Sequence, residues 1–243
     1  NKLKLNQTAL TKRKQYIILF SVKVGRIKNK LKLKAIKITF ITFETMGLNP
    51  LDYSIKKLNQ LAPEKGRLLI AEPFMQDEHF KRSVIFLVEH DEESTVGLVL
   101  NKTVGLKLNE VIRDFPKFDA EVFLGGPVQS EHLFYFHTKG ELINGSIPVG
   151  NGVFWAGDFR ALRDVIELNL IQPNEIRFFL GYSGWDKGQL INELKGDSWI
   201  ISETNTNLLF GTTDADDLWS TILKEKGKPY AMMANFPEDP NFN

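Results

Sequence analysis

Four segments of this 243-residue chain each join an apolar, strand-like run to a glycine turn or a polar tip. They span residues 66–90, 97–102, 123–128 and 179–190. Loops carried on rigid strands are where proteins commonly place function. The four segments therefore predict a fold rich in short strands, and they mark the first places to search for a functional site.

Short apolar runs between these turns predict the strands. The acidic stretch 91–94 is typical of a solvated turn between two of them, and a second turn is expected at 183–188. The predicted strands cover residues 68–71, 83–88, 95–100, 121–124, 133–137, 153–155, 176–181, 199–201 and 208–210.

Apolar residues at helical spacing predict five helices. A short one follows Asn49 and Pro50, and others cover 106–115, 159–170 (capped by Asp158), 189–194 and a final segment through Leu218 and Leu223 (capped by Thr213 or Asp214). Strands and helices are interspersed without a strict β-α-β rhythm. The sequence therefore favours an α+β domain with a mixed sheet over a doubly wound parallel sheet.

Charge is divided unequally along the chain, although the formal net charge is only +1. Residues 1–45 hold twelve of the 31 Lys and Arg residues and one of the 30 acidic residues, Glu44. The remainder therefore holds 19 basic and 29 acidic residues, a net charge of −10. An acidic domain is repelled by phosphate backbones, so direct nucleic-acid binding by residues 46–243 is not expected.

Residues 1–45 alternate Lys with aliphatic residues and lack helix caps and turn residues. We expect a basic, low-complexity extension that is disordered or not native, with Met46 opening the domain of residues 46–243. Two other interpretations stay open. The segment could be a basic arm for nucleic acid or an anionic membrane, or an edge hairpin.

The chain has no cysteine. This excludes disulfides, thiolate catalysis and Cys-ligated metal sites, and it agrees with a reducing cytoplasm. No run in the sequence approaches the roughly 18–20 apolar residues needed to span a bilayer. The N-terminal run 16–22 ends at Lys23 without a small-residue cleavage site. We expect a cytoplasmic protein with no membrane association.

The glycine-rich segment 179–190 allows three interpretations. A strand running into Gly181 and Ser183 resembles a nucleophile elbow, but Trp185 stands where the motif G-x-S-x-G needs glycine. Backbone amides of Gly181, Gly184 and Gly188 at a helix N-terminus could bind an anion. A tight turn that allows close packing is the favoured interpretation.

The histidines and acids supply no recognisable metal motif. Residues 77–79 and 90–93 contain oxygen and nitrogen ligand types, but neither H-E-x-x-H nor EF-hand spacing occurs. We therefore expect no metal and no cofactor. His90 and His137, each at the end of a predicted strand, are the main titrating candidates, and a structural role is favoured for both.

Arg82 precedes one strongly apolar run, and Asn101 follows another. Arg82 could pair with Asp77 or Glu72 inside a cleft, or it could line the rim of the sheet. Asn101 suits a turn that tolerates left-handed backbone. The structural interpretation is favoured for both residues.

Taken in order, the four segments resemble the YqgE/AlgH family of bacterial proteins. The family pattern G-x-L-L-[IV]-A-x-P-x-M-x-D-x-x-F-x-R-S-V matches residues 66–84, and G-x-V-[IL]-N-[KR] matches 97–102. G-G-P-V matches 125–128, and F-L-G-Y-[AS]-G-W-x-x-G-Q-L matches 179–190. The ending FPEDP at 236–240 resembles the subgroup from Bacteroidetes-type bacteria.

The resemblance implies a single compact cytosolic α+β domain with a mixed, partly barrel-like sheet surrounded by helices. It supplies no catalytic residues. Members are commonly described as transcriptional regulators, but the sequence contains no recognisable helix-turn-helix motif. Regulation is therefore expected to act through a protein or small-molecule partner.

These observations favour a non-enzymatic regulatory or binding protein with no catalytic residues, whose oligomeric state stays open. The expected binding site is the face where the strand-end turns converge: Arg82, His90, Asn101, Gly125, Gly126, Tyr182, Ser183, Trp185 and Gln189. Replacing Arg82 or Trp185 by Ala is expected to abolish binding more than folding. One alternative is a small-molecule hydrolase or transferase that uses His90 or Ser183 in the same cleft. A second is direct DNA binding through the basic N-terminal extension.

Overall fold

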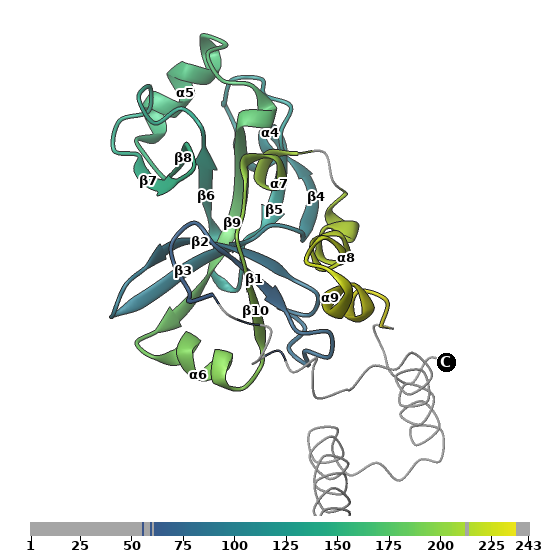
Figure 1. The fold of residues 1–243 in the computed structure, drawn as a ribbon. Helices are drawn as coiled ribbons and strands as arrows, with labels where there is room; N and C mark the ends of the chain where they lie inside the picture. The colour runs from purple at the N-terminus through teal and green to yellow at the C-terminus, as the bar shows by residue number, and fades with distance from the viewer. Residues whose placement is uncertain (1–54, 56–58, 60, 212–213, 237–243) are drawn as a thin grey trace, which may run out of the picture. The chain divides into compact units, whose positions relative to one another are not determined.

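Ten strands form one mixed sheet in the computed structural model (Figure 1). The structure describes residues 55, 59, 61–211 and 214–236, which belong to one compact unit within Leu51–Glu238. The predicted extension 1–45, most of the helix expected after Pro50 and the last seven residues lie outside this part. The strands are β1 (Leu68–Ala71), β2 (Val84–His90), β3 (Ser94–Val99), β4 (Thr103–Lys107), β5 (Glu121–Leu124), β6 (Val128–His137), β7 (Ile147–Gly150), β8 (Val153–Trp155), β9 (Ile176–Asp186) and β10 (Trp199–Ser202).

The strands follow the order β10-β1-β2-β3-β9-β6-β8-β7, and β5 joins β4 to β9. The pairings are antiparallel except that of β5 with β9, which is parallel. Within the described residues β10 and β7 do not pair with each other, so the sheet is open and not closed into a barrel. The predicted α+β class with a mixed sheet is confirmed.

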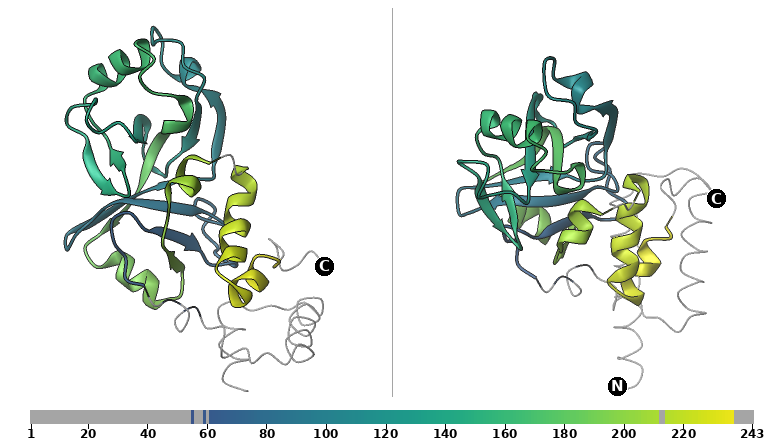
Figure 2. Two further views of the ribbon diagram at one scale, coloured as in Figure 1. Left: turned by 45° about the horizontal axis from the view of Figure 1, so that its top comes forward. Right: turned by 90° about the horizontal axis from the view of Figure 1, so that it is seen from above.

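Helices lie around the sheet (Figures 1 and 2). They are α4 (Leu108–Val111), α5 (Phe159–Glu167), α6 (Gln189–Lys195), α7 (Thr206–Phe210), α8 (Ala215–Glu225) and α9 (Lys228–Met233), with a 3₁₀ turn at Pro173–Glu175. The caps predicted by the sequence are present in α5 and α8. Asp158 accepts from the amides of Arg160 and Ala161, and Asp214 accepts from the amide of Asp216. None of the described helices has the length and apolarity needed to cross a membrane.

The long strand β9 corrects one prediction. The strand was expected to end at residue 181 and to be followed by a turn, but it continues to Asp186. Its second half pairs with β3, where Ser183 lies opposite Gly97 and Trp185 opposite Thr95. The backbone N–H and C=O groups of residues 183–186 are therefore paired with β3 in the sheet, and not within the predicted turn.

Further elements also differ from the predictions. Residues 106–107 extend β4 by pairing with β5, so the helix expected at 106–115 is reduced to α4. Residues 206–210 form α7 instead of a strand, because the side chain of Asn205 caps the amide of Leu208. Strands β4 and β7 and helix α9 were not predicted. Pro148 weakens the local strand signal, and Gly227 followed by Pro229 is typical of the end of the preceding helix, although proline is tolerated in the first turn of α9.

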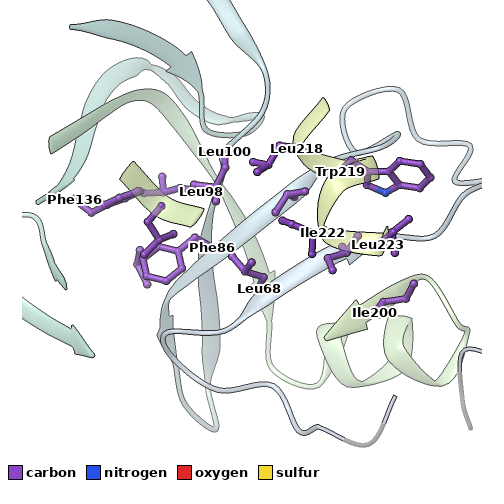
Figure 3. Packing of buried hydrophobic residues seen from close by; sticks show 14 of the residues in the cluster. Leu68, Phe86, Leu98, Leu100, Phe136, Ile200, Leu218, Trp219, Ile222 and Leu223 are labelled. Carbon is purple, nitrogen blue, oxygen red and sulfur yellow. The ribbon is translucent and has the colours of Figure 1, made fainter. Parts of the chain in front are cut away.

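Three apolar clusters form the core. The largest lies between α8 and the sheet, and Figure 3 shows Leu218 of α8 beside Leu100. A second cluster lies under α5 and includes Phe178, and a third includes Trp185 and Trp199 beside α6. Strand β9 supplies residues to all three, with Phe179 belonging to the first. It is therefore the element on which the packing of the whole sheet depends.

Candidate functional site

The nine residues predicted from sequence lie in three groups along β3 and do not form one cluster. Arg82 lies beside Asn101 just beyond one end of this strand, and Gly125, Gly126, Tyr182 and Ser183 lie near its middle. His90, Trp185 and Gln189 lie near its start, where His90 and Trp185 both pair with Thr95. The seven residues from Thr95 to Asn101 span roughly 20 Å in an extended chain. A small ligand therefore contacts one of these groups rather than all three.

The middle group is a close crossing of backbones. A Cβ atom added to Gly125 would lie 2.2 Å from the carbonyl oxygen of Gly181, and one added to Gly126 would lie 2.3 Å from that of Tyr182. The amide of Gly125 donates to the carbonyl of Leu180 over 2.8 Å. Glycine is needed here for packing of the β5–β6 connection against β9, and the Gly125 amide already has an internal partner.

Ser183 belongs to the same crossing. Its side chain is fully buried, and its hydroxyl donates to the carbonyl of Gly125 over 3.1 Å. His90 contacts the hydroxyl of Thr95 at 2.7 Å. Neither residue has a carboxylate within hydrogen-bond reach in the described part of the chain, so the base and orienting group of a nucleophilic site are missing around Ser183.

A serine–histidine pair that the sequence did not predict lies elsewhere, between Ser146 and His137. The two atoms Oγ and Nε2 are 3.1 Å apart. Nδ1 of His137 accepts from the amide of Lys139, so the ring proton lies on Nε2, which faces the carbonyl of Ala156 at 3.0 Å. The hydroxyl of Ser146 donates to the carbonyl of Ile143. Because Nε2 already carries a proton, His137 does not act as the base for Ser146.

The group around Trp185 anchors α6 to the sheet. Trp185 is 4% exposed, and its Nε1 donates to Oε2 of Glu193 over 2.8 Å. Trp199 donates to the same oxygen over 2.7 Å, and Gln189 donates to Oε1 over 3.0 Å. Glu193 was not predicted from the sequence, because no local pattern shows that one carboxylate accepts from two indoles.

The group around Arg82 has a different character. Its backbone is left-handed, with φ 51°, and Asn101 holds it by donating to the Arg82 carbonyl and accepting from the amide of Val84. The guanidinium lies 4.9 Å from the ring centroid of Trp219, and Nη2 donates to the carbonyl oxygen of Phe236. The predicted pairing of Arg82 with Asp77 or Glu72 is not recorded in the structure.

Two further features complete this group. The ring of Phe236 stacks on that of Phe74, with centroids 5.4 Å apart and an interplanar angle of 18°. Nε of Arg82 is buried and has no hydrogen-bond partner within the described residues. We call Phe74, Arg82 and Trp219 the Arg82 site, and Phe236 contacts its members Phe74 and Arg82. Only Arg82 of this site was predicted from the sequence, since its contact with Phe236 joins residues 154 positions apart.

A second buried arginine was not predicted. Arg177 donates to the carbonyls of Leu100 and Leu209 and lies 4.0 Å from the ring centroid of Phe123. Burial lowers the pKa of its guanidinium to about 10, while Glu121 acts in the opposite direction. At neutral pH the group stays charged, and it ties the end of β3 to α7.

Metal ligands do not gather in the part of the chain that the structure describes: it contains no group of three or more His, Asp or Glu residues able to hold an ion. What remains are an aromatic and cationic surface at Arg82 and polar groups that are satisfied internally. The arrangement is suited to recognition by stacking and hydrogen bonding.

Comparison with known proteins gives the same family as the sequence motifs. A family model described as AlgH-like matches residues 68–231. A UPF0301 protein of Bacteroides fragilis is 41% identical over 200 residues, covering 82% of this chain and 100% of the relative. A UPF0301 protein of Chlorobium limicola is 38% identical over 190 residues, covering 78% and 100%.

Two solved structures share the fold. The solution structure of AlgH from Pseudomonas aeruginosa matches with a TM-score of 0.58 and 28% identity, covering 74% of this chain and 98% of that protein. Protein DIP2367 from Corynebacterium diphtheriae matches with a TM-score of 0.61 and 21% identity, covering 73% and 95%. The motifs, the family model and the relatives agree, and the chain belongs to the AlgH-like family.

Proposed function

We propose that this chain is a bacterial, cytoplasmic binding protein that acts in regulation by contacting a protein or small-molecule partner, and that it is not an enzyme. The observation that carries this proposal is the Arg82 site. A guanidinium held over an indole, beside an aromatic ring and with an unsatisfied donor, is equipped to recognise a ligand.

The alternative of a hydrolase or transferase is disfavoured by the hydrogen bonds of its candidate groups. Ser183 donates to a backbone carbonyl, and His90 contacts the hydroxyl of Thr95. In the Ser146–His137 pair, which was not predicted, Nε2 carries a proton instead of accepting one. A nucleophilic hydroxyl needs a base that accepts its proton. The hydroxyls of Ser183 and Ser146 instead donate to backbone carbonyls.

Direct DNA binding is disfavoured for residues 46–243 by their excess of acidic residues. Fluorescence anisotropy with duplex DNA at near-physiological salt tests this, comparing the full chain with a chain that begins at Met46. Specific binding by the shorter chain would contradict the proposal. Weak, strongly salt-dependent binding by the full chain alone is the behaviour of a polycationic tail.

The binding proposal itself is tested by Arg82→Gln. Partners are crosslinked in cells that express the wild-type chain or this variant, and their recovery is measured by mass spectrometry. We expect at least a tenfold loss of a specific partner or ligand with Arg82→Gln. The exposed Arg163 on α5 supplies the matched control Arg163→Gln, which should retain it.

Thermal unfolding of both variants separates binding from folding. A similar midpoint for Arg82→Gln and Arg163→Gln, together with a selective loss of partner, supports a role of Arg82 in recognition. Full recovery of the partner with Arg82→Gln would show that the Arg82 site is not where it binds.

A further inference from the structure

We infer that the Arg82 site recognises an aromatic residue bearing a free α-carboxylate, as at the C-terminus of a partner protein, and that Phe236 occupies this site in cis. The inference rests on the proposed function, since it names the partner chemistry of the same site. Two observations support it: Phe236 contacts both Phe74 and Arg82, and Nε of Arg82 has no hydrogen-bond partner among the described residues.

Phe236 leaves half of one guanidinium edge unused. In arginine, Nε–H and one N–H of Nη2 point in the same direction and fit the two oxygens of a carboxylate. Nη2 of Arg82 donates to the carbonyl oxygen of Phe236, whereas the buried Nε has no partner in the described part of the chain. A single carbonyl oxygen therefore stands where two carboxylate oxygens would fit.

The rest of the site is fixed before any ligand binds. Trp219 lies beneath the guanidinium, and its own Nε1 donates to the carbonyl of Ala71 over 2.9 Å. Asn101 holds the left-handed backbone of Arg82 through the Arg82 carbonyl. Such preorganisation reduces the entropy lost on binding.

The position of Phe236 defines the ligand. Its ring stacks on Phe74 while its own carbonyl contacts Arg82, so one residue supplies both contacts. In this chain that carbonyl is joined to the nitrogen of Pro237. In a C-terminal aromatic residue a second, negatively charged oxygen takes the place of that nitrogen and can accept from Nε.

The test uses the full chain carrying Phe236→Ala, which removes the cis ring and keeps the chain length. The probe is the fluorescent tripeptide Ala-Asn-Phe, a copy of residues 234–236, with either a free carboxylate or a C-terminal amide. Fluorescence polarisation should give a Kd about tenfold lower for the acid than for the amide, the gain expected from a second charge-assisted hydrogen bond. The wild-type chain should bind the acid more weakly than Phe236→Ala does, because Phe236 competes.

Two variants in the Phe236→Ala background complete the design. Arg82→Lys keeps the charge but lacks the paired donors, so it should lose most of the preference for the acid. Arg163→Gln, an exposed position on α5, should keep that preference. Equal binding of acid and amide to Phe236→Ala, or an unchanged preference in Arg82→Lys, would overturn the inference.

The tripeptide experiment and the crosslinking experiment can fail independently of each other. If neither tripeptide binds Phe236→Ala while Arg82-dependent crosslinking in cells persists, the ligand chemistry is wrong and the binding proposal stands. If the acid binds selectively while crosslinking does not depend on Arg82, the site recognises aromatic carboxylates and the cellular role proposed for it is wrong.

Discussion

At the scale of single residues, hydrogen-bond direction decides what a titratable group can do. His137 is buried, and burial lowers its pKa below the ordinary value while the Ala156 carbonyl acts weakly in the opposite direction. Its neutral ring accepts at Nδ1 and donates at Nε2. A second ring proton would sit on Nδ1, which could then no longer accept from the amide of Lys139. His137 is therefore a structural residue, as favoured from the sequence.

The lowered pKa of His137 predicts how stability depends on pH. The unfolded chain takes up a proton near pH 6.5, whereas the folded chain does so only at lower pH, so the unfolded state binds more protons between these values. The free energy of unfolding should therefore fall as pH decreases from about 7. Urea denaturation at a series of pH values measures this. The variant His137→Gln should be less stable at pH 7 and show a flatter profile between pH 7 and 5; an unchanged slope would contradict the assignment.

At the scale of elements, local sequence signals determine where a helix begins, and tertiary contacts determine how far a strand runs. Helices α5 and α8 were predicted well because Asp158 and Asp214 cap them. Strand β9 was predicted too short, because its extension to Asp186 depends on pairing with β3, a segment about ninety positions away in the sequence. Trp219 and Phe236 are likewise far from Arg82 in the sequence, so neither was included in the predicted site.

Helix α6 provides a prediction at this scale. Glu193 accepts from the indoles of Trp185 and Trp199, which are almost fully buried. Glu193→Ala leaves both donors without a partner and should reduce the free energy of unfolding by about 2–6 kcal/mol, since each orphaned donor costs about 1–3 kcal/mol. Chemical denaturation followed by tryptophan fluorescence measures the loss.

Two variants of α6 serve as controls for Glu193→Ala. Glu193→Gln keeps an oxygen acceptor and should cost less. Lys195, exposed at the end of the same helix, gives Lys195→Ala, which should change stability by no more than about 0.5 kcal/mol. Equal effects of Glu193→Ala and Lys195→Ala would show that the two indoles do not depend on this carboxylate.

At the scale of the whole molecule, β9 joins clusters that would otherwise be separate. Its consecutive residues Phe178 and Phe179 point to opposite faces, and they belong to the cluster under α5 and the cluster under α8, respectively. Arg177, the residue before them, ties the end of β3 to α7 through the carbonyls of Leu100 and Leu209. Loosening one cluster therefore loosens the strand that supports the other.

This arrangement predicts that the two clusters unfold together. Phe178→Leu removes volume only from the cluster under α5 and should reduce the free energy of unfolding by about 1 kcal/mol. Native-state hydrogen exchange should show the same loss of protection for the slowest amides of α5 and of β2, although β2 supplies no residue to that cluster. Phe159→Leu, at a partly exposed position of α5, is the control and should change both little. A loss confined to α5 would show that the clusters open independently, and the role assigned to β9 would then be wrong.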